Sequence, residues 1–190
     1  VREQTPRFPI ERCQEMLEQY AQVLGELQTM ETQNKPLAPE LMAKLVATDV
    51  GVFGPVDAKV VLVEFSDFLC PACQAAALTV ESSRDRYKDT VRIVFRQFPL
   101  PKHGENARLG AQAALAAGAQ GKFWEMHDRL FASPMELGTE GRAAVDRWAQ
   151  EIGLDMGAFG AALDAKTYDA AITADMALGE EAMVGGTPTF

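Results

Sequence analysis

Two cysteines three positions apart, Cys70 and Cys73, stand where an apolar run of strand type changes into an Ala-rich run of helix type. The segment KVVLVEF before them is rich in β-branched and aromatic residues, which predicts a buried strand. The run from Pro71 to Tyr87 favours a helix, with proline at an early position where its missing N–H is harmless. The pair is therefore expected at the start of a helix that directly follows a strand.

Three interpretations of this pair follow from the residues. A sulfur at a helix N-terminus is stabilised as a thiolate by unpaired N–H groups and the helix dipole, and a partner one turn away can form a disulfide with it. A zinc site needs two more ligands, but His103, His127 and Cys13 form no second paired knuckle. Two buried structural cysteines are the third alternative. The position between strand and helix favours redox chemistry.

The order of the other segments indicates one α/β domain with a long helical part. A short edge strand in TDVGVFGPVDA, the strand KVVLVEF, the helix and the strand TVRIVFRQF come first. Only helical patterns follow, separated by Gly and Asp, and ASPMELGTEG is expected to be a loop. The expected helices span about residues 105–118, 122–131, 140–152, 156–164 and 168–183.

Composition limits the classes of protein that this chain can belong to. Its 190 residues can bury one substantial core, and 47% hydrophobic with 24% charged residues is usual for a globular domain. The net charge of −9, with no run of Lys or Arg, argues against a nucleic-acid partner. The longest apolar stretches are shorter than a membrane span needs, and the first residues lack the pattern of a secretory signal.

The first 47 residues are expected to form a helical appendage. Within it, residues 8–29 place apolar side chains at alternating steps of three and four, the spacing of a coiled-coil seam. The seam positions are Ile10, Cys13, Leu17, Tyr20, Leu24 and Leu27. Such a stripe either packs on its own domain or pairs with the same helix of a second chain. A homodimer through residues 8–29 would bring two Cys13 side chains together and favour isomerase over oxidase activity.

Four segments, in this order, resemble the DsbA-like branch of the thioredoxin superfamily. They are VVLVEFSDFLCPACQ, FRQFPLPKHGENA, AQGKFWEMHDRLF and VGGTPTF. The resemblance covers about residues 50–190 and implies a thioredoxin-like α/β fold. In this fold a helical insertion, about residues 104–183, separates the second core strand from a cis-proline loop. The implied function is a thiol:disulfide oxidoreductase that forms or reshuffles disulfides in exported proteins.

The resemblance also implies the setting of this activity and the roles of individual residues. Cys70 would be the nucleophile and Cys73 the cysteine that resolves the mixed disulfide. Thr187 and Pro188 match the cis-proline loop, whose backbone would pair with a substrate segment. The enzyme would need no cofactor and no metal. It would work with a redox partner protein in the periplasm or another extracytoplasmic space.

Glu64, six residues before Cys70, stands inside an otherwise apolar strand. A buried carboxylate is costly unless it has a partner or a task. By resemblance, Glu64 matches an acid beneath the active site that moves a proton to or from Cys73. An edge-exposed glutamate is the alternative.

The dipeptide between the cysteines, Pro71-Ala72, departs from the Pro-His pair of the strongly oxidising DsbA. Ala72 cannot donate a hydrogen bond or carry a charge toward the Cys70 thiolate, so we predict a milder oxidant. The alternative function is a non-catalytic binding or chaperone module in which the two cysteines form a structural disulfide. Equal, slow alkylation of both cysteines would favour this alternative.

Two further expectations concern the histidines and the end of the chain. His103 and His127 are expected to be structural, because His127 falls on one helix face with Phe123 and Phe131.

After TPTF a thioredoxin fold needs a hairpin and a last helix. The domain expected over residues 48–190 would therefore lack its C-terminal strands and helix, which a longer natural chain or a second chain would supply.

Overall fold

The computed structural model describes residues 20, 22, 24, 25, 28 and 36–190. The chain divides into two units, Val1–Ala38 and Pro39–Phe190. In the first unit, Tyr20 and Leu24 of the expected seam are helical. The other seam positions lie outside the described residues, so the coiled-coil interpretation of residues 8–29 stays a prediction.

The second unit contains a small mixed sheet. Its strands in the described part of the chain are β1 (Val52–Phe53), β2 (Val60–Ser66) and β3 (Val91–Gln97). The middle strand, β3, pairs antiparallel with β1 and parallel with β2, the latter through seven consecutive residue pairs. A parallel pair needs a crossover connection, and helix α3 (Pro71–Tyr87) supplies it.

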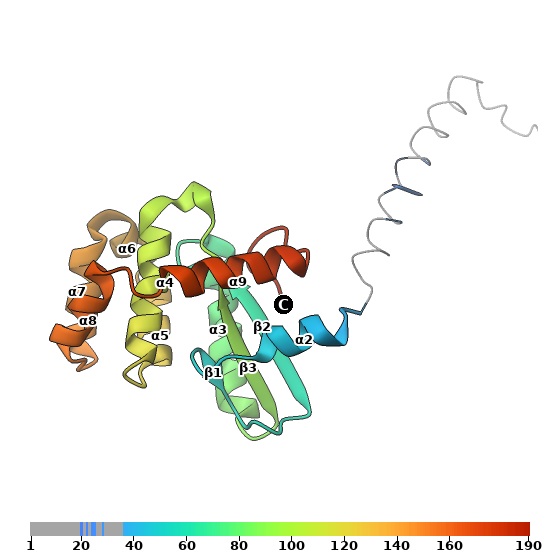
Figure 1. Cartoon of the computed structure of the whole chain (residues 1–190), viewed down its shortest axis with the longest axis horizontal. Coiled ribbons are helices and arrows are strands. Elements are labelled where there is room, and N and C mark those ends of the chain that lie inside the picture. The colour runs from blue at the N-terminus through green and yellow to red at the C-terminus, as the bar shows by residue number, and fades with distance from the viewer. Residues whose placement is uncertain (1–19, 21, 23, 26–27, 29–35) are drawn as a thin grey trace, which may run out of the picture. The chain divides into compact units, whose positions relative to one another are not determined.

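The helical part of the domain follows β3 and a short 3₁₀ turn at Pro101–His103. Its helices are α4 (Gly104–Gly118), α5 (Phe123–Ala132), α6 (Pro134–Glu140), α7 (Arg142–Glu151), α8 (Met156–Asp164) and α9 (Asp169–Glu181). Figure 1 shows α4 to α8 gathered beside the sheet, whereas α9 returns across it. None of the described helices is both long and apolar enough to cross a membrane.

Helix α6 corrects one expectation, since ASPMELGTEG does not form a loop. Pro134 occupies the first helical position, where proline costs no hydrogen bond. Leu137 is completely buried in the core, and the helix ends at Gly141, whose φ of 53° suits glycine. The loop prediction is wrong because the burial of Leu137 outweighs the low helix propensity of Gly138.

Helices α3 and α9 cover opposite faces of the sheet. Phe95 of β3 packs in one buried cluster with Cys73 of α3. Phe65 of β2 points to the other face and contacts α9. Gly179 of α9 lies so close to Phe65 that an added Cβ atom would come within 3.1 Å of the phenyl ring. Because strand side chains alternate between faces, Glu64 lies on the α3 side, as its strand partner Phe95 does.

Helix α2 (Pro39–Val46) belongs to the second unit, which begins at Pro39. Arg96 of β3 donates hydrogen bonds of 3.0 and 3.3 Å to the carbonyl groups of Leu45 and Ala47, at the end of α2. It also pairs with Asp175 of α9 at 2.8 Å. A positively charged guanidinium is attracted to the negative C-terminal end of the helix dipole. Charge as well as packing therefore holds α2 against the sheet.

Candidate functional site

Cys70 is the N-cap residue of α3, with an extended backbone (φ −80°, ψ 122°), and Pro71 is the first helical residue. The Cys70 N–H donates to the Asp67 carbonyl, and the Cys70 carbonyl accepts from the Gln74 N–H, each at 3.0 Å. These bonds hold the sulfur at the mouth of the helix. There, the first N–H groups have no partner inside the helix and can face a thiolate.

The two thiols of the pair are free and differ in environment. Cys70 keeps 6% of its surface exposed, whereas Cys73 keeps none. Burial raises the pKa of the Cys70 thiol, but the Thr187 side chain and the N–H groups of Cys73 and Ala72 lower it, and the net shift is downward. Burial raises the pKa of Cys73 to about 11, against smaller lowering effects of Ser66 and Thr187. Cys70 is therefore the better nucleophile.

The loop at Thr187 and Pro188 lies against the cysteine pair. The Thr187 carbonyl is 3.4 Å from the Cys70 sulfur, and the peptide bond before Pro188 is cis. Thr189 and Phe65 of β2 exchange two backbone hydrogen bonds, of 2.9 and 3.1 Å, which anchor the loop beside the sheet. The structure thus brings together two predicted motifs that are far apart in sequence.

Glu64 is completely buried, which overturns the alternative of an edge-exposed side chain. Neither carboxylate oxygen has a hydrogen-bond partner among the described residues. Burial raises the pKa of Glu64 to about 7, opposed to a smaller degree by the Ser66 hydroxyl and the charge of Arg84. A carboxyl group that titrates near neutral pH can take up or release a proton under working conditions.

Asp67 is a residue that the sequence analysis missed. Its fully buried carboxylate accepts hydrogen bonds from the Leu69 and Leu100 N–H groups, at 2.8 and 2.7 Å, and from His103 Nδ1 at 2.7 Å. Its backbone N–H lies 3.5 Å from the Cys73 sulfur. A short acidic side chain in an apolar turn just before the cysteines was the available signal, because such a group needs several partners when buried.

A cavity of about 610 Å³ opens beside Cys70, between α3 and the start of α6. Several of the residues that line this cavity are apolar, among them Leu69, Pro71 and Met135. The Met135 side chain is 79% exposed. His103 also lines this cavity, so one of the two histidines lies at the site.

His127 has the structural environment that the sequence analysis expected. Its ring is 1% exposed and contacts five aromatic rings, those of Phe68, Phe95, Phe123, Trp124 and Phe131. Burial lowers the pKa of His127, although the hydrogen bond to Asp128 opposes this shift. The imidazole therefore serves as part of the aromatic core.

A family model described as thioredoxin matches residues 47–190. The chain belongs to the thioredoxin family. The structure of a thioredoxin-like oxidoreductase from Silicibacter pomeroyi is 35% identical, with a TM-score of 0.60 over 72% of this chain and 76% of that chain. The thiol-disulfide exchange protein α-DsbA2 of Wolbachia pipientis is 21% identical and shares the fold, with a TM-score of 0.66 over 78% of each chain.

Curated relatives of this thioredoxin-family chain are much longer proteins. The Na⁺/H⁺ antiporter NhaA 3 of Salinispora tropica is 39% identical over 139 residues, which are 73% of this chain and 21% of the relative. The antiporter NhaA of Herminiimonas arsenicoxydans is 34% identical over 137 residues, 72% of this chain and 21% of the relative. The chain spans about a fifth of the length of these relatives, whose names describe the whole proteins.

Proposed function

We propose that this chain is a protein thiol:disulfide oxidoreductase that acts on cysteine-containing substrates through Cys70 and Cys73. The observation that carries the proposal is the contrast between the two thiols. Cys70 sits at a helix mouth with a lowered pKa, 3.4 Å from the Thr187 carbonyl, while Cys73 is sealed from solvent with a pKa of about 11. A purely structural pair would not need this difference.

In the oxidising direction the pair starts as a disulfide. A substrate thiolate attacks the Cys70 sulfur, the S–S bond breaks, and the electron pair leaves on Cys73, which then takes up a proton because its pKa is high. A second substrate thiolate attacks the substrate sulfur of the mixed disulfide and expels Cys70 as a thiolate. The substrate loses two electrons and gains a disulfide, and the protein gains two electrons as a dithiol.

The other site residues would support this exchange. Glu64, buried on the face of the sheet that α3 covers, would give or take the Cys73 proton. Thr187 and Pro188 would offer backbone groups to an extended substrate segment beside Cys70. Pro71 and Ala72 would set the stability of the Cys70 thiolate, and Ala72 would make the pair a milder oxidant than one with histidine at that position.

The setting of the reaction is part of the proposal. A redox partner protein would return the cysteine pair to its starting oxidation state after each cycle. The reduction potential of this partner would decide whether the chain acts as an oxidase, an isomerase or a reductase. An extracytoplasmic location suits the proposed exported substrates, because disulfides persist in oxidising compartments.

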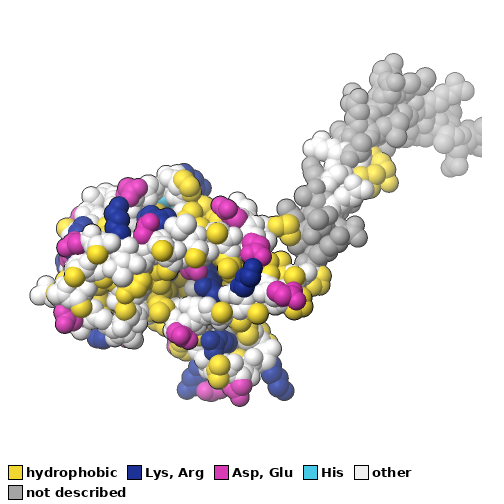
Figure 2. Space-filling view, in the orientation of Figure 1, with side chains coloured by type: hydrophobic (Ala, Val, Ile, Leu, Met, Phe, Trp, Pro, Cys, Tyr) yellow, Lys and Arg dark blue, Asp and Glu magenta, His cyan; other side chains and the backbone are white. Residues whose placement is uncertain are grey.

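Figure 2 shows Lys and Arg interspersed with Asp and Glu over the visible face of the second unit. This mixture gives nucleic acid no continuous basic surface on that face.

An oxidative refolding assay tests the function. The oxidised chain should restore activity to a reduced multi-disulfide protein, and Cys70→Ser should abolish this. Cys73→Ala, mixed with the disulfide form of the substrate, should accumulate a mixed disulfide visible by mass, because its Cys70 thiolate attacks a substrate disulfide and no second cysteine releases the product. Cys13→Ser is the control, because it removes a cysteine outside the proposed pair. Full activity of Cys70→Ser, with equal slow alkylation of both cysteines in the parent chain, would favour the binding or chaperone module instead.

Residues 8–29 carry a separate part of the proposal, a homodimer with isomerase activity. Light scattering on the full chain should give twice the monomer mass, and Leu24→Glu should return it to the monomer by placing a charge in the seam. A parent chain that is a monomer and still reshuffles scrambled disulfides would contradict the link between dimer and isomerase.

A further inference from the structure

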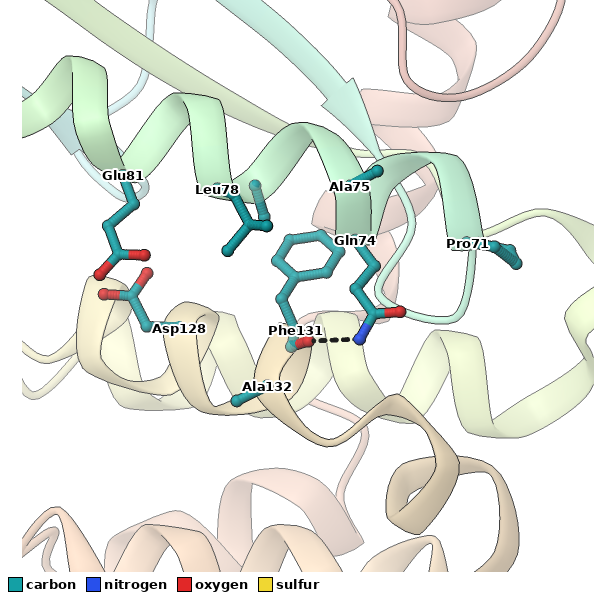
Figure 3. Close-up of a pocket in the computed structure, with 9 residues that line it drawn as sticks. Pro71, Gln74, Ala75, Leu78, Glu81, Asp128, Phe131 and Ala132 are labelled. Carbon is teal, nitrogen blue, oxygen red and sulfur yellow. Dashed lines mark hydrogen bonds between the residues drawn. The ribbon is translucent and has the colours of Figure 1, made fainter.

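A second cavity continues the one beside Cys70 along α3. It has a volume of about 480 Å³ and shares Pro71, Gln74 and Ala132 with the first. Figure 3 shows that its walls come from α3 and α5, and that Leu78 lies along it. Leu78 is 68% exposed, so its apolar side chain is available to a bound segment. We call the two cavities together the α3–α5 groove, which begins at Cys70.

Gln74 lies in the stretch that the two cavities share. Its Nε2 donates a hydrogen bond of 3.1 Å to the Phe131 carbonyl, the dashed line in Figure 3. This bond fixes the side-chain amide across the groove and leaves Oε1 without a donor from the described residues. An acceptor held in this way suits a backbone N–H of an extended polypeptide.

The far end of the groove carries two carboxylates, Glu81 of α3 and Asp128 of α5, which point toward each other in Figure 3. Asp128 is already paired, with Arg84 at 2.6 Å and with His127 Nδ1 at 2.8 Å. No ion pair within the described part of the chain involves Glu81. The end of the groove therefore has an uncompensated negative charge that a cationic side chain would complement.

We propose that the α3–α5 groove binds the substrate segment next to the reactive cysteine and prefers apolar residues followed by Lys or Arg. This inference rests on the proposed thiol–disulfide exchange and names the class of segment that the site selects. Three features support it: the groove starts at the nucleophile, its walls are largely apolar, and its far end is acidic. An oppositely charged site would also speed the encounter with such a segment.

The helix geometry predicts where the basic residue should stand. Glu81 follows Cys70 by eleven positions, which at about 1.5 Å per residue is roughly 16 Å along the helix. An extended chain advances about 3.3 Å per residue, so it covers this distance in about five residues. The Lys or Arg should therefore lie about five positions from the substrate cysteine, on the flank that enters the groove.

Short peptides with one cysteine provide the test. The full chain with Cys13→Ser and Cys73→Ala is loaded at Cys70 with thionitrobenzoate, and release of this coloured group measures attack by the peptide thiol. The peptides have an apolar linker and carry Arg or Glu about five positions before or after the cysteine. On one flank the Arg peptide should react about three- to fivefold faster than the Glu peptide, and added salt should reduce the ratio.

Glu81→Gln should bring this ratio close to one, while Glu40→Gln, which removes the same charge from α2, should leave it unchanged. Leu78→Ser should slow the peptides with an apolar linker and leave those with a Gly/Ser linker unaffected. An equal ratio in the Glu81→Gln and parent chains, or no charge preference on either flank, would overturn the groove proposal while leaving exchange at Cys70 intact. Failure of every peptide to release the coloured group would instead overturn the proposed exchange, and the groove proposal with it.

Discussion

The Asp67 carboxylate lies 2.7 Å from Nδ1 of His103, and this contact joins the turn before Cys70 to the segment that follows β3. The same carboxylate accepts hydrogen bonds from two backbone N–H groups, and the Asp67 backbone nitrogen lies 3.5 Å from the Cys73 sulfur. One side chain therefore connects the cysteine turn, the sheet end and a wall of the cavity beside Cys70. We infer that Asp67 is a positioning residue of the redox pair.

Replacing Asp67 by Ala should lower the free energy of unfolding by about 2 to 4 kcal/mol, because two buried N–H groups and His103 lose a charged acceptor. His103→Ala removes one of the three bonds and should cost about 1 kcal/mol. Urea unfolding of the dithiol forms measures both. An Asp67→Ala chain that unfolds at the urea midpoint of the parent would refute the positioning role, as would unchanged alkylation of Cys73.

The buried Thr187 hydroxyl has no hydrogen-bond partner among the described residues, so it is free to turn toward the Cys70 thiolate, and it contributes to the lowered pKa of the Cys70 thiol. Thr187→Ala should therefore raise this pKa, and alkylation of Cys70 at neutral pH should slow by a few-fold, roughly in proportion to the lost thiolate. The pH dependence of thiolate ultraviolet absorbance gives the pKa directly. Thr189→Ala is a matched control two positions further along, and an equal effect of both variants would argue against a specific role of Thr187.

Glu64 should make stability depend on pH. In the folded chain its pKa is about 7, against an ordinary 4.5, so the folded state binds more protons between these values and stability falls as the pH rises through this range. Glu64→Gln has no charge to bury and should be more stable than the parent by up to about 3 kcal/mol near pH 8, with no gain near pH 4. Urea unfolding at both pH values tests this, and an equal gain at both would contradict it.

If Glu64 also moves the Cys73 proton, Glu64→Gln should slow release of Cys73 from the disulfide. The rate of reaction between the oxidised chain and a small thiol measures this step as a function of pH. In the parent the rate should change near pH 7, and in the variant that change should be absent. A rate profile that is identical in the two chains would leave Glu64 with an effect on stability alone.

Ala72→His should make the redox pair more oxidising. A histidine at the exposed second position of α3 can donate a hydrogen bond toward the Cys70 thiolate and stabilise the reduced form by about 1 to 2 kcal/mol, which corresponds to about 20 to 40 mV. Equilibration with glutathione followed by mass measurement gives the potential. Ala75→His, one turn further along α3, is the control, and a potential that stays the same or falls in Ala72→His would contradict the prediction.

Local patterns in the sequence determined the elements around the redox pair. The β-branched run before Cys70 and the proline at the first helical position define a strand followed by a helix, because both signals act within a few residues. The same kind of signal located α4, α5, α7, α8 and α9 to within a few residues. It missed α6 and predicted a loop there, because the packing of Leu137 decides the conformation and no local pattern records that packing.

Only the tertiary structure decided which groups surround the two sulfurs. Thr187 approaches Cys70 across 117 positions of sequence, and Asp67 finds its partner His103 across 36. The groove between α3 and α5 likewise exists because two helices from different parts of the chain pack side by side. These relations depend on burial and on hydrogen bonds between distant segments, and the pKa values of Glu64 and Cys73 follow from that burial, which no short stretch of sequence specifies.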